Sequence, residues 1–69
     1  MPIIRVEMWE GRSKAQKAEL VESFSNEMAR ITGCGLDSIY VVIDEVTKEN
    51  WGAGGQLCSE NTLIKRGYL

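Results

Sequence analysis

Directly after Met1 the chain has the stretch Pro2-Ile3-Ile4-Arg5-Val6-Glu7-Met8. Even-numbered positions in this stretch are apolar, whereas the odd-numbered positions after Ile3 are charged. Such alternation predicts a strand over residues 2–8 in a sheet that is covered on one face. Residues 9–12 break the alternation, and Gly11 is typical of a turn.

A long helix is predicted next. Ser13 and Gln16 have the spacing of a capping box, with Ser13 as the N-cap. The helix runs to about Thr32, where Gly33 ends it because glycine accepts the left-handed backbone conformation. Its apolar residues recur at three- and four-residue steps and form one stripe, namely Leu20, Val21, Phe24, Met28 and Ile31. Cys34 is interpreted as a small packing residue, because no base that would activate its thiol can be named.

A second strand is predicted over residues 38–46, where β-branched residues are frequent. Strand, helix and strand make a β-α-β unit, whose two strands run parallel. Residues 48–59 are rich in glycine but lack the lysine and the following helix of a phosphate-binding loop, so they predict a tight hairpin. The fold class is therefore α/β, a single domain over residues 1–69 in which residues 60–69 are a C-terminal extension.

Composition excludes several functions. A chain of 69 residues has room for one domain. Its net charge of -2 and pI near 5.0 argue against nucleic-acid binding. The absence of histidine removes the commonest general base, and two lone cysteines do not make a zinc site, so no metal or cofactor is expected. No apolar run is long enough to cross a membrane and no signal peptide is recognised, so we expect a cytoplasmic location.

A sheet of two strands with one helix cannot close its own core or protect its strand edges. Chains of this length often reach stability through oligomerisation. We therefore expect copies of the chain to assemble, with their sheets extended or stacked between subunits.

Pro2 carries the most distinctive chemistry. If Met1 is removed, Pro2 has a free secondary amine, and an α-amino group needs only a modest pKa shift to exchange protons at pH 7. If Met1 stays, the Pro2 nitrogen is an amide and is not a base. In the other interpretation, Pro2 merely starts an edge strand, where a missing N–H does no harm.

Three segments, in this order and spacing, resemble the 4-oxalocrotonate tautomerase family, the small-subunit branch of the tautomerase superfamily. They are Met1-Pro2-Ile3, Glu10-Gly11-Arg12-Ser13 and Trp51-Gly52-Ala53-Gly54-Gly55. The resemblance runs from about residue 2 to residue 59. It implies a β-α-β fold with a short C-terminal hairpin, dimers that form four-stranded sheets, and a hexamer made of three dimers.

The resemblance also implies roles for individual residues. Pro2 corresponds to the general base that moves a proton in an enol or unsaturated keto acid, without a cofactor. Arg12 corresponds to an arginine that binds the distal carboxylate of a dicarboxylate, for which two parallel hydrogen bonds suit a guanidinium. Trp51 corresponds to an aromatic wall of the pocket and could equally anchor the hairpin, and Trp9 is assigned as a second wall.

At Tyr40 the chain departs from the family, which has a second arginine there. That arginine polarises the keto and carboxylate end of the substrate, whereas tyrosine donates a hydrogen bond but brings no charge. Tyr40 either replaces the arginine in part or is an ordinary strand residue. We assign Tyr40, together with Ser38, to substrate binding.

The predicted function is a cofactor-independent tautomerase or isomerase acting on a small unsaturated keto or enol acid. One alternative is a non-catalytic subunit, or a subunit of a hetero-oligomer, that binds a small acid. Another is a hydratase or dehalogenase, which needs a carboxylate such as Glu7, Glu10 or Asp44 to activate water. The expected partners are a small carboxylate-bearing substrate and further copies of the chain.

Overall fold

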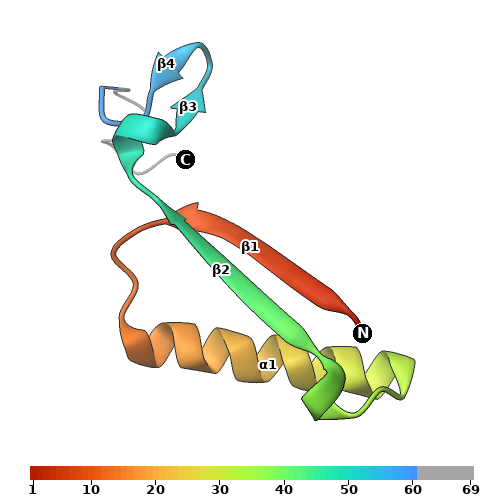
Figure 1. Ribbon diagram of the computed structural model, residues 1–69. Coiled ribbons are helices and arrows are strands. Elements are labelled where there is room, and N and C mark those ends of the chain that lie inside the picture. The colour runs from red at the N-terminus through yellow and green to blue at the C-terminus, as the bar shows by residue number, and fades with distance from the viewer. Residues whose placement is uncertain (61–69) are drawn as a thin grey trace.

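The structure, a computed structural model, describes residues 1–60 and consists of a β-α-β unit followed by a small hairpin (Figure 1). Helix α1 runs along one side of two parallel strands, and the hairpin lies beyond the far end of β2. The elements in chain order are β1 (Ile3–Trp9), α1 (Lys14–Thr32), the 3-10 turn η1 (Leu36–Ser38), β2 (Tyr40–Val46), the 3-10 turn η2 (Lys48–Asn50), β3 (Gly52–Ala53) and β4 (Gln56–Leu57).

Strands β1 and β2 pair in parallel over their whole length, from Ile3 opposite Tyr40 to Trp9 opposite Val46. The predicted alternation is confirmed in β1, because its even positions are half-buried and its odd positions up to Glu7 are exposed. An ion pair of 2.6 Å between Lys17 of α1 and Glu45 of β2 ties the helix to the sheet.

The predicted capping box is present at the start of α1. The Ser13 hydroxyl accepts a hydrogen bond from the Gln16 backbone N–H at 3.1 Å, and the Gln16 side chain accepts one from the Ser13 N–H at 2.9 Å. At the other end Gly33 takes a φ of 77° and donates its N–H to the Ala29 carbonyl at 2.9 Å. These two ends give the helix the predicted length.

The strand boundaries differ from the prediction by one or two residues. Strand β1 begins after Pro2 and extends to Trp9, which pairs with Val46 rather than opening the turn. Strand β2 begins at Tyr40, because Ser38 closes a 3-10 turn by donating its N–H and its hydroxyl to the Gly35 carbonyl. Serine commonly forms such local bonds with the backbone, and they compete with strand pairing.

The predicted hairpin is confirmed. Strands β3 and β4 pair antiparallel, and the two residues between them, Gly54 and Gly55, have φ of 62° and 81°. Two consecutive positive φ angles are typical of the tight turn that suits a two-residue hairpin. The predicted extension over residues 60–69 lies, except for Glu60, outside the described residues.

One chain buries little apolar surface. Among residues 1–60, the buried hydrophobic residues are Ile39 and Cys58. Other large apolar side chains stay exposed, such as Ile3 at 58% and Ile31 at 67%. Cys34 is a half-buried free thiol, which fits a packing role. Within the described part of the chain, no helix has the length and apolar character that a membrane crossing needs.

Candidate active site

Pro2, Ser38 and Tyr40 lie together at the start of the two strands. The Pro2 carbonyl accepts a hydrogen bond of 3.0 Å from the Tyr40 N–H. The Tyr40 side chain is 52% exposed and alternates with half-buried Val41, so it lies on the sheet face opposite α1. The Ser38 hydroxyl is engaged with the Gly35 carbonyl at 2.8 Å. This group, Pro2, Ser38 and Tyr40, is called the proline end below.

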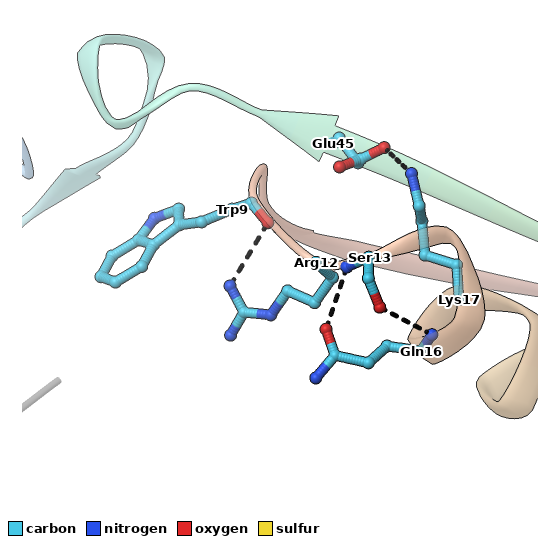
Figure 2. A network of polar contacts seen from close by, with 6 residues as sticks. All are labelled: Trp9, Arg12, Ser13, Gln16, Lys17 and Glu45. Carbon is cyan, nitrogen blue, oxygen red and sulfur yellow. Dashed lines mark hydrogen bonds and ion pairs between the residues drawn. The ribbon is translucent and has the colours of Figure 1, made fainter.

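Trp9, Arg12 and Trp51 lie together at the other end of the strands. The two indole rings meet edge to face, with 6.2 Å between their centroids and an angle of 79° between their planes. The Arg12 guanidinium reaches back to the Trp9 carbonyl, with 3.4 Å from Nη1 to the oxygen (Figure 2). Since 3.4 Å is long for a hydrogen bond, the guanidinium is lightly held and keeps donors for a ligand.

Lys48 also lies in this second group, although it was not among the residues predicted from the sequence. Its Nζ lies over the Trp9 ring, 5.0 Å from the centroid. A signal for it exists, because parallel strands end at the same edge of a sheet and Lys48 follows β2 as Arg12 follows β1. This group, Trp9, Arg12, Lys48 and Trp51, is called the tryptophan end below.

The proline end and the tryptophan end do not meet within one chain. Strand β1 has seven residues, and at the rise of a strand it separates Pro2 from Trp9 by about 20 Å. In Figure 1 the N-terminus and the hairpin accordingly lie at opposite ends of the strands. A single chain therefore places Pro2 beside Tyr40 and Arg12 beside Trp9, but it does not bring Pro2 to Arg12.

Two hollows lie along α1, and neither is lined by Pro2 or by a tryptophan. The larger, of about 600 Å³, lies between the helix and the η1 segment and includes Val21, Leu36 and Ile39 in its lining. The smaller, of about 310 Å³, includes Arg12 and Leu20. Neither hollow could hold a substrate against both Pro2 and Arg12.

The family model for tautomerase enzymes matches residues 2–61 of the chain. The chain belongs to the tautomerase family. It is 40% identical over 60 residues to a 2-hydroxymuconate tautomerase from Pseudomonas putida, a match that covers 87% of this chain and 95% of that protein. The predicted family resemblance is confirmed, and the chain is an enzyme of this family.

Solved structures agree in fold. A 4-oxalocrotonate tautomerase homologue superposes with a TM-score of 0.84 at 33% identity, covering 88% of this chain and 97% of that one. A heterohexamer 4-oxalocrotonate tautomerase from Chloroflexus aurantiacus superposes with a TM-score of 0.81 at 37% identity, covering 87% and 97%. The parallel β-α-β unit with its C-terminal hairpin is the fold of these tautomerases.

Proposed function

We propose that the chain, once Met1 is removed, uses the Pro2 amine as the general base of a cofactor-independent tautomerase. Its substrate is a small unsaturated keto or enol acid. The position of Pro2 carries this proposal, because Pro2 precedes the first strand at an open end of the sheet, beside the exposed Tyr40. The base takes a proton from the enol hydroxyl or from a carbon of the substrate and delivers it to another carbon, a step that needs no metal or cofactor.

The site is completed by a second copy of the chain. The carboxylate-binding Arg12 lies about 20 Å from the Pro2 of its own chain, so both can contact one small substrate only if they come from different chains. When two strands pair antiparallel, the start of one lies beside the end of the other. A symmetric pair of chains joined in this way has two equivalent sites, each with one proline end and one tryptophan end.

The exposed apolar surface supports assembly. The sheet face opposite α1 presents Ile3, Tyr40 and Val42, and η1 presents Leu36, all exposed in the single chain. Exposed apolar surface on a small domain commonly marks an interface with another chain. We expect dimers through the sheets, and three dimers in a hexamer, as the resemblance implies.

Two synthetic chains test the role of Pro2, one of residues 1–69 and one of residues 2–69. They differ only in whether the Pro2 nitrogen is an amide or an amine, and each is assayed for turnover of 2-hydroxymuconate and of phenylpyruvate. We expect turnover by the shorter chain. The turnover rate of the longer chain should be lower by a factor of about one hundred or more, because a general base contributes about 10²–10⁴-fold to the rate. Pro2→Ala in the shorter chain should lower turnover as well, and equal turnover by the two chains would overturn the proposal.

A separate measurement tests whether Met1 is removed. The intact mass of the chain purified from its natural host shows whether the methionine is present. A mass that lacks methionine supports a free Pro2 amine, whereas its retention on nearly every chain contradicts the proposed base.

A second candidate function is a subunit of a mixed oligomer that binds a small acid. Tyr40 favours it, because this residue brings no charge where the family has an arginine, and a relative that is 37% identical is described as a heterohexamer. Turnover by the purified chain alone would exclude it. A hydratase or dehalogenase is less well supported, because Asp44 is engaged by Arg5 at 2.6 Å, which leaves Glu7 and Glu10 to activate water.

The cytoplasmic location stays a prediction that rests on the sequence. The two cysteines are both free, and thiols remain reduced in that compartment.

A further inference from the structure

Trp9 makes three contacts at the tryptophan end, and two of them are made by its ring. Its main-chain carbonyl accepts the long hydrogen bond from Arg12 at 3.4 Å. Its indole meets that of Trp51 edge to face, with 6.2 Å between the centroids. Lys48 places its Nζ over the Trp9 ring, 5.0 Å from the centroid. The ring of Trp9 is therefore held by one aromatic and one cationic side chain.

No hydrogen bond fixes the orientation of the Trp9 ring. Its indole Nε1–H is buried and has no acceptor within the part of the chain that the structure describes. A ring without a polar anchor turns readily, because the torsion next to an aromatic ring has broad minima. The contacts with Lys48 and Trp51 are then what sets the direction of the ring.

Lys48 keeps the charge that its contact with the ring needs. The ion pairs among residues 1–60 are Arg5–Asp44, Lys17–Glu45 and Arg30–Glu27. No carboxylate of this part of the chain therefore neutralises Lys48. The face of an indole is the best aromatic partner for an ammonium group, so the interaction with Trp9 attracts and holds the cation.

Lys48 is also joined to Trp51, through the main chain. The Trp51 N–H donates to the Lys48 carbonyl at 3.4 Å and closes the turn η2. On the hairpin side, the Trp51 carbonyl accepts the Cys58 N–H at 2.8 Å, and Cys58 is 1% exposed. Lys48 thus connects the end of β1 with the start of the hairpin, the two segments that carry the pair of indoles.

We propose that Lys48 is a positioning residue, whose ammonium group holds the Trp9 ring in the orientation that packs against Trp51. It acts through the two indoles and does not contact the substrate. The inference rests on the proposed function in one respect, because ordered indoles aid turnover only if they form the pocket wall that the family resemblance implies. A displaced wall admits water, which weakens the electrostatic interactions within a site. The effect on turnover should therefore fall on kcat rather than on substrate binding.

Substitutions at position 48 separate the charge from the length of the side chain. K48M keeps an unbranched apolar side chain and removes the ammonium group, whereas K48R keeps a cation that stacks on an indole. K14M is the matched control, because Lys14 is likewise an exposed lysine outside the ion pairs of residues 1–60. W9L removes the ring that Lys48 holds, and K48M/W9L combines both changes. All variants are made in the 2–69 chain.

The first readout needs no substrate. Two indoles this close give a coupled circular-dichroism signal, which is identified as the signal that W9L loses. The signal is followed with temperature below the unfolding transition. In K48M the ratio of packed to displaced Trp9 rings should fall about two- to fivefold, since a cation–π contact at an exposed site contributes about that factor. K48R and K14M should keep the signal of the unmodified chain, and an unchanged signal in K48M would overturn the inference.

The second readout is turnover of 2-hydroxymuconate. We expect K48M to lower kcat about two- to fivefold while KM changes by less than about twofold, K48R to restore kcat, and K14M to match the unmodified chain. In W9L, which has no ring to hold, adding K48M should lower kcat no further, because changes that act through one contact are not additive. A raised KM with kcat unchanged would mean that Lys48 binds the substrate itself. That result, or an equal loss of kcat with and without Trp9, would overturn the inference.

Failure of the proposed function would give a different set of results. If the 2–69 chain does not turn over 2-hydroxymuconate, while K48M loses the coupled signal and K48R keeps it, the proposed base is wrong. The orientation of the indole pair by Lys48 then stands on the spectroscopic result.

Discussion

Mixing two impaired variants tests whether the site is shared between chains. In P2A the proline end loses the proposed base, and in R12A the tryptophan end loses the proposed carboxylate anchor. Each variant keeps the other end of the site intact. Because strand β1 holds the two ends about 20 Å apart within one chain, a functional site can form only where the Pro2 of an R12A chain faces the Arg12 of a P2A chain.

The activity that the mixture should recover follows from how the two kinds of variant chain pair. When the two variants are unfolded, combined in equal amounts and refolded, half of the proline ends carry Pro2 and half of the tryptophan ends carry Arg12. About one quarter of the sites then have both residues if the chains pair at random. Loss of the base should leave P2A with about 1% of the activity or less. Loss of a charged hydrogen-bonding partner, worth about 1.5–3 kcal/mol, should leave R12A with about a tenth or less.

The assay is turnover of 2-hydroxymuconate per chain before and after mixing, with native mass spectrometry to show that mixed assemblies have formed. A mixture of P2A with the double variant P2A/R12A is the control, because it contains no Pro2 and should recover nothing. Activity of the mixture that stays at the average of the two variants, although mixed assemblies are present, would refute the shared site.

Two further predictions concern helix α1. S13A removes the hydroxyl that accepts the Gln16 N–H and should lower the free energy of unfolding by about 1 kcal/mol. Urea unfolding at fixed chain concentration measures this, and S23A, in the exposed middle of the helix, should show no such loss. Arg30 donates to the Glu27 carboxylate and lowers the pKa of Glu27. This pair therefore stabilises the folded chain at pH values above the ordinary glutamate pKa of 4.5. The stabilisation is lost as the pH falls through the lowered pKa. The difference in Tm between E27Q and the unmodified chain should therefore shrink on acidification, and a difference that is constant from pH 7 to pH 3 would contradict the assigned pair.

Local sequence signals predicted the elements well. The capping box at Ser13 and the glycine at Gly33 determine both ends of α1, because each acts through hydrogen bonds within a few residues. The glycine pair at Gly54 and Gly55 likewise determines the hairpin turn. Ser38 escaped prediction as part of a turn, because β-branched neighbours favoured a strand while its hydroxyl bonds locally to Gly35.

The site was predictable only in part, because it depends on distances between segments. Alternation along residues 2–8 identifies the faces of β1 but not the register that sets Ile3 opposite Tyr40 and Trp9 opposite Val46. That register decides which residues gather at each end of the sheet. It brings Lys48 to Trp9, a contact that no local pattern marks.

Pairing with a second chain would account for two properties of the single chain, its small core and the distance between Pro2 and Arg12. Exposed Ile3, Tyr40 and Leu36 leave the chain with little core of its own, and β1 keeps the proposed base from its carboxylate anchor. An antiparallel neighbour would cover apolar surface and, by the same geometry, set the tryptophan end of one chain beside the proline end of another. A separate device for bringing Pro2 and Arg12 together would then be unnecessary, because the contact that we expect to stabilise the fold would also complete the proposed site.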